Sequence, residues 1–208
     1  MKGPLVILSG PSGCGKSTVT ARLLARGDLP LRQSVSATTR PPRRGEEDGR
    51  HYCFWTRERF EAEVRADGFL EWAEVYGNYY GTPRAEVEPY RKRGTGVILV
   101  IDVQGAAQVR ARCPDAVSVF LRASSWEECE RRLRLRGQDD EATILRRLAN
   151  ARGELARAGE YQFEVINDDL DTAVEQLHAI VKAQFTSPPS PLGGEGRGEA
   201  TERSDHAG

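Results

Sequence analysis

The sequence contains no apolar run long enough to cross a membrane. Its longest apolar stretches are Pro4–Leu8 and Val97–Ile101, whereas a membrane-spanning helix needs about 20 apolar residues. The first stretch leads directly into a glycine-rich loop, with no small-residue cleavage site after it, so we expect no signal peptide. These absences favour a cytoplasmic protein without a membrane partner.

Cysteine and net charge are also scarce. The 208 residues include four cysteines, and their spacing is not that of a zinc or redox site, so we expect free thiols. The formal net charge is −1, which argues against a broad polyanion-binding surface and against nucleic acid as a partner. With 38% hydrophobic and 29% charged residues, the composition is that of one globular domain.

Short apolar runs alternate with amphipathic segments along most of the chain, which is typical of an α/β fold. We expect buried strands at Leu5–Leu8, Val97–Ile101, Ala116–Leu121 and Phe163–Ile166. We expect helices at Ser17–Arg26, Val103–Arg112, Ser125–Arg136, Asp139–Ala158 and Asp169–Phe185. The pattern therefore predicts a core sheet of parallel strands with flanking helices.

Two regions have a different composition. Between Arg32 and Arg93 the apolar positions are sparser and aromatic residues are concentrated, which predicts an inserted small α+β subdomain with one helix near Arg57–Asp67. Residues 187–208 are rich in proline, glycine and serine. Because such a stretch has too little apolar surface to offset its ordering entropy, we expect a disordered tail.

A glycine-rich motif follows the first predicted strand. Gly10-Pro-Ser-Gly-Cys-Gly-Lys16-Ser17 fits G-x-x-x-x-G-K-[ST] and precedes a predicted helix, which is the context that this motif requires. Backbone N–H groups of such a loop bind phosphate, Lys16 would bridge the donor phosphates, and the Ser17 hydroxyl would help hold Mg²⁺. Cys14 lies near the helix N-terminus, where thiolates are stabilised, so we expect a reactive thiol. The motif predicts a nucleoside triphosphate site.

A phosphate loop alone does not separate kinases from GTPases, ATPases and motor proteins. The chain has no Asn-Lys-x-Asp motif of the kind that reads guanine in small GTPases. It does have an arginine-rich segment, in which two prolines stiffen the chain between Arg40 and Arg43. Both planar guanidinium groups could then bind one phosphate. Taken singly, however, such arginines are more often solvated, and clustered aromatic residues more often belong to a core.

Seven motifs, in order along the chain, closely resemble those of the guanylate kinase family. They are Gly-Pro-Ser-Gly-x-Gly-Lys-Ser-Thr (Gly10–Thr18), Ser-x-Thr-Thr-Arg-x-Pro-Arg with Gly-Glu (Ser36–Glu46), Glu-Trp-Ala (Glu71–Ala73), Gly-Asn-Tyr-Tyr-Gly (Gly77–Gly81), Ile-Asp-x-Gln-Gly (Ile101–Gly105), Arg-Leu-x-x-Arg-Gly (Arg132–Gly137) and Asn-Asp-Asp-Leu-Asp (Asn167–Asp171). The resemblance extends over residues 3–185, which is essentially the whole chain except its tail.

The resemblance implies a kinase that transfers the γ-phosphoryl group of ATP to GMP, with Mg²⁺ as cofactor, and yields ADP and GDP. It implies three parts within residues 1–186. These are a parallel-sheet core (about 1–33, 94–125 and 160–186), a GMP-binding subdomain (about 34–93) and a mobile helical lid (about 126–159).

The family's functional residues match positions of this chain. The ATP-binding residues would be Gly10, Pro11, Ser12, Gly13, Cys14, Gly15, Lys16, Ser17, Thr18 and, near the adenine, Asn167. The catalytic residues would be Lys16, Arg136 and Arg147, and Ser17 would contact Mg²⁺. The GMP phosphate would be held by Arg40, Arg43, Tyr52 and Tyr80, and the guanine by Ser36, Glu71, Thr82 and Asp102.

The proposed guanine contacts have a chemical rationale. Guanine offers N1–H and N2–H₂ donors and an O6 acceptor, so the Glu71 carboxylate can pair with the donors and the Ser36 hydroxyl with O6. Adenine would leave these groups unpaired, so the site would reject AMP. No residue obviously reads the ribose 2′-OH, so the use of dGMP stays open. Val100 stands where the family usually carries an acidic residue, which puts in doubt any water network around Mg²⁺ that uses that position.

Two other interpretations remain open at this point. One is a related kinase for a ribose bisphosphate or another nucleoside monophosphate, although such an acceptor gives Glu71 no guanine edge to read. The other is a guanylate-kinase-like scaffold module that binds proteins without catalysis, although such modules lack an intact phosphate loop. The sequence does not decide between a monomer and a homo-oligomer.

Overall fold

In the computed structural model, the described residues are 1–75, 77–135 and 141–186, and for 142, 143, 146 and 147 the description covers the backbone alone. Two sheets organise this part of the chain. The larger has five parallel strands in the order β2-β7-β1-β8-β9, and the smaller has four strands in the order β4-β3-β6-β5. The predicted α/β class with a parallel core sheet is confirmed.

The larger sheet is formed by segments from both ends of the described chain. Its strands are β1 (Leu5–Ser9), β2 (Leu31–Gln33), β7 (Gly96–Val100), β8 (Ala116–Arg122) and β9 (Phe163–Ile166). The apolar runs predicted as strands form four of them. The fifth, β2, was not predicted because it has only three residues, and none of these is buried.

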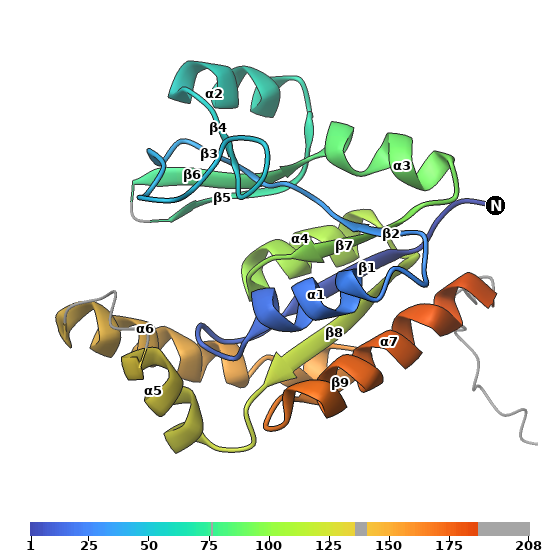
Figure 1. The fold of residues 1–208 in the computed structure, drawn as a ribbon. Helices are drawn as coiled ribbons and strands as arrows, with labels where there is room; N and C mark the ends of the chain where they lie inside the picture. The colour runs from blue at the N-terminus through green and yellow to red at the C-terminus, as the bar shows by residue number, and fades with distance from the viewer. Residues whose placement is uncertain (76, 136–140, 187–208) are drawn as a thin grey trace, which may run out of the picture.

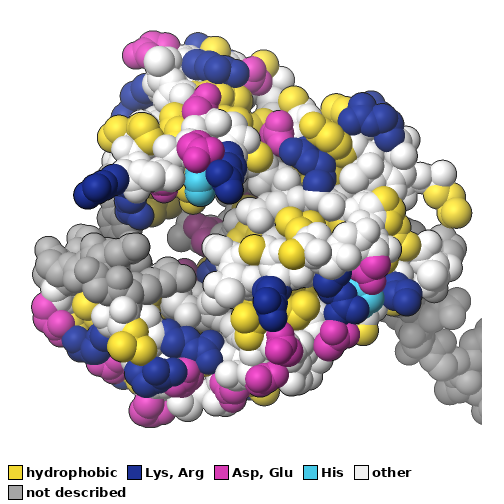
Figure 2. All heavy atoms as spheres, in the orientation of Figure 1, with side chains coloured by type: hydrophobic (Ala, Val, Ile, Leu, Met, Phe, Trp, Pro, Cys, Tyr) yellow, Lys and Arg dark blue, Asp and Glu magenta, His cyan; other side chains and the backbone are white. Residues whose placement is uncertain are grey.

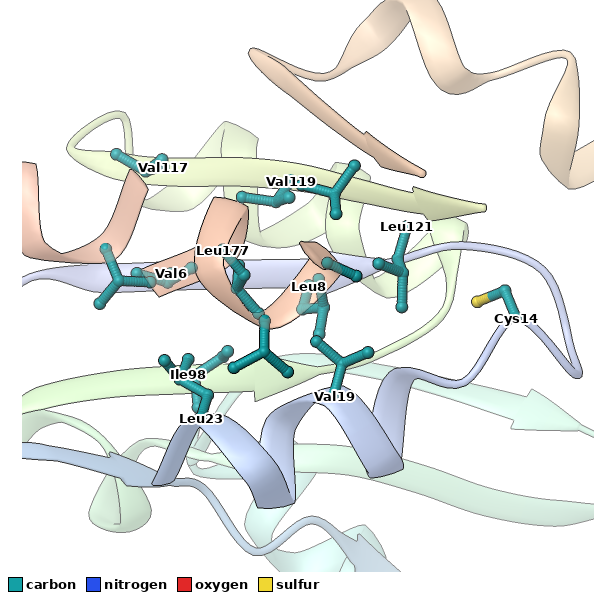
Figure 3. Close-up of a cluster of buried hydrophobic side chains, with 14 residues drawn as sticks. Val6, Leu8, Cys14, Val19, Leu23, Ile98, Val117, Val119, Leu121 and Leu177 are labelled. Carbon is teal, nitrogen blue, oxygen red and sulfur yellow. The ribbon is translucent and has the colours of Figure 1, made fainter. Parts of the chain in front are cut away.

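Helices cover both faces of this sheet (Figure 1). On one face lie α1 (Lys16–Ala25) and α7 (Leu170–Thr186), and on the other lies α4 (Val103–Arg112). Side chains alternate along β1, so Val6 and Leu8 join the cluster beneath α1 and α7, as Figure 3 shows. Leu5 and Ile7 join the cluster beneath α4. Burial on both faces explains why these strands are uninterrupted apolar runs.

The smaller sheet is formed entirely by residues 37–83 and has an aromatic core. Its elements are β3 (Ala37–Thr38), β4 (Cys53–Phe54), β5 (Phe69–Val75), β6 (Asn78–Pro83) and helix α2 (Arg57–Arg65). Phe60 of α2 stacks on Phe69 of β5 with ring centroids 4.3 Å apart. Trp55, Trp72 and Tyr79 surround this pair. The aromatic composition of this segment therefore mostly serves packing.

Two further helices, α5 (Trp126–Leu135) and α6 (Glu141–Leu155), pack through a small apolar cluster of their own that includes Leu133 and Leu148. The short elements η1 (Arg84–Glu86), α3 (Glu88–Lys92) and η2 (Ala158–Glu160) complete the description. Val87 and Tyr90, at α3, pack with the cluster beneath α4 rather than with the smaller sheet. Within the described ranges, no helix is long and apolar enough to span a membrane.

Candidate active site

A cavity of about 410 Å³ opens between the carboxyl end of the parallel sheet and the smaller sheet. Figure 2 shows this face of the molecule hollowed below the smaller sheet. The lining residues are Gly10, Ser12, Lys16, Ser17, Ser36, Tyr52, Glu71, Ala73, Val75, Tyr80, Gly81, Val100, Ile101, Asp102 and Glu154. A second cavity, of about 760 Å³, shares part of this lining and adds Arg40 and Arg43. Ligands of α/β sheets bind at this end of the strands. Several predicted site residues from segments far apart in sequence line these cavities, among them Lys16, Ser36, Arg40, Glu71 and Asp102, whereas Thr82 and Asn167 lie outside both linings.

The glycine-rich loop connects β1 to α1 with three residues of positive φ, namely Gly10 (144°), Gly13 (88°) and Gly15 (93°). At Gly10 a Cβ atom would lie 1.9 Å from the Leu121 carbonyl oxygen, so the loop could not pass β8 with a larger residue. Gly15 is the N-cap of α1 and provides no side-chain cap. The first N–H groups of α1 therefore remain available to an anion.

The Lys16 ammonium donates to two carbonyl oxygens of the loop, those of Gly10 (2.6 Å) and Pro11 (3.0 Å). Lys16 and Ser17 both line the cavity. Cys14 lies in the same loop, but its side chain is fully buried in the cluster beneath α1 and α7. This burial contradicts the accessible, reactive thiol that the helix N-terminus suggested. All four cysteines are free, as predicted.

Asn167 contacts the backbone of the phosphate loop through a buried side chain. Its side chain is 5% exposed, and its amide Nδ2 donates to the Cys14 carbonyl oxygen at 2.8 Å. The backbone oxygen of Asn167 accepts from Arg132 Nη1 at 2.6 Å, which ties this position to α5. The contact with adenine that the resemblance implies for Asn167 stays a prediction, whereas its contact with the loop is direct.

Glu71 lies on β5 at the wall of the cavity, with 6% of its surface exposed. Its Oε1 accepts a hydrogen bond of 2.6 Å from the hydroxyl of Thr82, the residue paired with it across β5 and β6. Burial raises the pKa of the Glu71 carboxyl to about 7, against the opposing effect of Thr82 and with a smaller contribution from the charge of Asp102. The free enzyme therefore holds a carboxyl that exchanges its proton near neutral pH.

Asp102 follows β7 and caps α4, because its Oδ1 accepts from the backbone N–H groups of Gln104 (2.9 Å) and Gly105 (2.8 Å). This capping places Asp102 at the rim of both cavities. Ser36 lines the smaller cavity, and so does Val100, the position for which the resemblance implies an acidic residue. The wall at position 100 is therefore apolar.

In the arginine-rich segment, Arg40 and Arg43 line the larger cavity, and the Arg40 guanidinium is paired with a carboxylate. The Arg40 guanidinium binds both oxygens of Glu46, at 2.9 and 3.0 Å, and lies beside the ring of Tyr52. Glu46 Oε2 also accepts from the backbone N–H of Arg43 at 2.6 Å. The Arg40 guanidinium holds the pKa of the Glu46 carboxyl below its usual range. Glu46 thus orients the segment, a role that its place in the Gly-Glu motif did not reveal.

Tyr52 and Tyr80 face the cavities as an edge-to-face pair with ring centroids 6.0 Å apart. Burial raises the pKa of the Tyr52 hydroxyl, so it stays a hydrogen-bond donor at neutral pH. The rings lie beside Arg40, and hydroxyl and guanidinium donors are the groups that bind phosphate oxygens.

Glu154 of α6 is a residue that the sequence analysis missed. It lines both cavities, and its Oε2 is buried without a hydrogen-bond partner. Burial raises the pKa of its carboxyl, against the opposing charge of Lys16. Arg136 lies outside the described residues, and Arg147 lies on α6 with its side chain outside them. The part of α6 that the structure describes thus contributes a carboxylate to the site.

Comparisons with known proteins agree on one family. The family model described as Guanylate kinase matches residues 2–184. The guanylate kinase of Synechococcus sp. (strain JA-3-3Ab) is 49% identical over 190 residues, which cover 91% of this chain and 85% of the relative. That of Parasynechococcus marenigrum (strain WH8102) is 50% identical, with 86% and 98% covered. The crystal structure of guanylate kinase from Anaplasma phagocytophilum superposes with a TM-score of 0.73 at 32% identity, with 92% of this chain and 91% of that chain covered.

Proposed function

The chain belongs to the guanylate kinase family and transfers a phosphoryl group from ATP to GMP, and we propose that the two substrates meet in the cavity between the phosphate loop and the smaller sheet. The observation that carries this assignment is the juxtaposition of Lys16 and Glu71 in the lining of one cavity. One belongs to a phosphate-binding loop, and the other is a buried acceptor for the donors of a base.

On the donor side, the phosphates of ATP would bind to the N–H groups of the loop and of the first turn of α1. Lys16 would exchange its two carbonyl contacts for phosphate oxygens, which hold an ammonium group more strongly. Asn167 would keep the loop in place through the Cys14 carbonyl group.

The residues present also fit Mg²⁺. The Ser17 hydroxyl and the carboxylates of Asp102 and Glu154 line the same cavity as Lys16, so oxygen groups surround the place where donor phosphates would lie. Mg²⁺ is usually held by few protein oxygens together with phosphates and waters, and here Ser17 would supply the protein contact. When bound, the ion neutralises phosphate charge.

On the acceptor side, we infer that the GMP phosphate binds to Arg40, Arg43, Tyr52 and Tyr80. Arg40 is already oriented by Glu46 on one edge of its guanidinium. Two cationic groups and two hydroxyls would offset the repulsion between the phosphates of the two substrates, which must approach in line. The acceptor is a phosphate oxygen, so the reaction needs positioning and charge neutralisation rather than a strong general base.

The guanine base would lie against β5 and β6. The Glu71 carboxylate would accept from N1–H and N2–H₂, while Thr82 keeps its Oε1 oriented, and Ser36 and Asp102 would complete the pocket. Glu71 is the residue that distinguishes guanine from adenine in this proposal, because a carboxylate finds no N1–H on adenine. It also argues against a sugar-phosphate acceptor.

We assign the parts of the chain accordingly. Residues 34–93 would form the GMP-binding subdomain, residues 126–159 a lid that brings Arg136 and Arg147 to the donor phosphates, and residues 187–208 a tail outside the catalytic unit. We propose that the enzyme acts in the cytoplasm. The intact phosphate loop argues against a scaffold that has lost catalysis.

A coupled assay of ADP release tests the assignment, with GMP, dGMP, AMP, UMP or no acceptor supplied beside Mg²⁺ and ATP. We expect fast turnover with GMP and little with AMP or UMP. Equal rates with GMP and AMP would refute the role of Glu71, and ADP release without any acceptor would indicate an ATPase. Omission of Mg²⁺ should abolish turnover, and Ser17→Ala should raise the Mg²⁺ concentration needed for half-maximal rate.

A further inference from the structure

One face of α4 contacts the edge of the smaller sheet along its length. β5 is the outer strand of that sheet, so one row of its backbone groups has no neighbouring strand. α4 lies against this edge and packs with the parallel sheet on its other side (Figure 1). The helix therefore connects the rigid core to the strand that carries Glu71.

The contacts recur at helical spacing. Gly105 lies against the carboxylate of Glu71, and a Cβ atom at that position would be 2.7 Å from its Oε2. Three residues later, the Gln108 amide accepts from Trp72 N (3.3 Å) and donates to Trp72 O (2.9 Å). One turn further on, Arg112 Nη1 donates to Phe69 O at 2.9 Å. These three residues lie on one face of α4.

We propose that Gly105 and Gln108 are positioning residues for the guanine site, and that they fix Glu71 at the depth from which it reads the base. This inference rests on the proposed role of Glu71. Gln108 satisfies both backbone groups of Trp72, as a neighbouring strand would, and so sets where β5 lies relative to α4. Gly105 provides the space that the Glu71 carboxylate then occupies.

Two contacts define where the Glu71 carboxylate lies. Its Oε1 is held by the Thr82 hydroxyl, and its Oε2 faces the backbone of α4 at Gly105. A methyl group at position 105 must push the carboxylate away, and the Glu71 side chain is flexible enough to move at small cost in stability. The same movement would misplace the oxygens that accept from N1–H and N2–H₂. The methyl group should therefore weaken the binding of GMP without lowering the stability of the fold.

The test compares Gly105→Ala with Gly159→Ala in the full-length enzyme. A Cβ atom at Gly159 would have no heavy atom within 4 Å, and Gly159 lies in η2, at the boundary between the proposed lid and the core and outside the lining of both cavities. We expect Gly105→Ala to raise the Kd of GMP by about tenfold or more, the loss of one good hydrogen bond, to narrow the GMP:AMP selectivity, and to leave the Kd of ATP unchanged. Its melting temperature should not fall, since Ala favours a helix over Gly. Gly159→Ala should change none of these quantities.

Gln108→Ala gives a second, independent variant, with Gln184→Ala of α7 as its control. Gln108→Ala leaves Trp72 N and O without their partner, so it should raise the Kd of GMP while the Kd of ATP stays constant. The inference is overturned if both site variants retain normal GMP affinity and selectivity, or if GMP and ATP affinities fall together with the melting temperature.

A combination with Glu71→Gln separates this inference from the proposed function. If Gly105 acts through Glu71, Gly105→Ala should cost much less GMP affinity in the Glu71→Gln background than in the wild type. Equal costs in both backgrounds would refute the positioning role. If Glu71→Gln by itself leaves the GMP:AMP selectivity unchanged, the proposed reading of guanine fails, and that result is visible without any variant of α4.

Discussion

The donor and acceptor halves of the site are built in different ways. The phosphate loop is one uninterrupted stretch, Gly10–Ser17, and its geometry depends on backbone amides and on glycines of positive φ. The acceptor half is assembled from side chains on β5, β6, α4 and the segment around Arg40, which meet only in the folded protein. In our proposal, the first half is generic for nucleoside triphosphates, and the second half carries the selectivity for the acceptor.

A second difference is electrostatic. The Lys16 ammonium in the donor half donates to uncharged groups of its own loop, the carbonyl oxygens of Gly10 and Pro11 and the sulfur of Cys14. In the acceptor half, Arg40 is already paired with Glu46, and Glu71 carries a pKa raised to about 7. Substitutions in the donor half should therefore lower turnover equally for all acceptors. The effect of substitutions in the acceptor half should depend on the base of the acceptor and on pH.

The largest effect is expected from Lys16→Ala. Removal of the ammonium group leaves the charge that develops on the transferred phosphoryl group without its partner, and we expect a loss of roughly a thousandfold in kcat. Steady-state assays with GMP and with AMP should show the same relative loss of kcat for both acceptors. A folded Lys16→Ala protein with near-normal turnover would remove Lys16 from the mechanism.

Arg40→Lys tests the acceptor half at its phosphate end. Lysine keeps the charge but not the planar fork that binds Glu46 on one edge and would bind phosphate on the other. We expect KM for GMP to rise by about ten- to a hundredfold, because hydrogen bonds to charged groups contribute about 1.5–3 kcal/mol. KM for ATP should stay constant. A parallel rise in both KM values would show that Arg40 serves the fold of the segment.

The pH dependence of GMP binding tests the state of Glu71. Only the ionised carboxylate accepts from both guanine donors, so binding must remove the proton that the free enzyme holds below a pKa of about 7. Below this pH the Kd of GMP should rise by about tenfold per pH unit. Calorimetry from pH 5.5 to 8.5 measures this dependence. Glu71→Gln provides the control, because it removes the titration of Glu71 and retains those of the GMP phosphate and of Glu154. If the Kd of GMP depends on pH in the same way for the wild type and for Glu71→Gln, the prediction is wrong.

The last effect concerns the stability of the fold rather than the binding of a substrate. The folded pKa of Glu71 lies above the ordinary value of 4.5, so its contribution is favourable at low pH and is lost as pH rises from 4.5 to 7. At pH 8 the ionised carboxylate should cost up to about 3 kcal/mol. Glu71→Gln should therefore unfold at higher urea concentration than the wild type at pH 8, with little difference at pH 4.5. Lower stability of the variant at pH 8 would contradict this account.

The same comparison shows what the sequence could predict. The phosphate loop and the helix Val103–Arg112 depend on local pattern, and both appear where they were expected. Cys14 was misjudged because its position in a helix-terminal loop does not reveal that its side chain points into the core. Glu154 could not be foreseen, because only the packing of α6 brings it to a loop about 140 residues earlier in the chain.

The acceptor half illustrates the same limit. The resemblance implies that Glu71 and Thr82 lie beside the base, which stays a prediction, but the hydrogen bond between them follows from the cross-strand register of β5 and β6. The contact of Gly105 with Glu71 requires the docking of α4 on the edge of the smaller sheet. A sequence motif names such residues without showing which of them touch.

The central claim is that Glu71 gives the acceptor half its preference for guanine. Steady-state kinetics of Glu71→Gln with GMP and AMP test it most directly. The substitution exchanges one acceptor oxygen for an amide donor. With GMP, this should reduce the stabilisation of the transition state by about 2–4 kcal/mol, which lowers kcat/KM roughly a hundredfold or more. AMP turnover and the KM for ATP should barely change, so the GMP:AMP ratio should collapse. An unchanged ratio, with both acceptors affected alike, would show that Glu71 is structural and that guanine is read elsewhere.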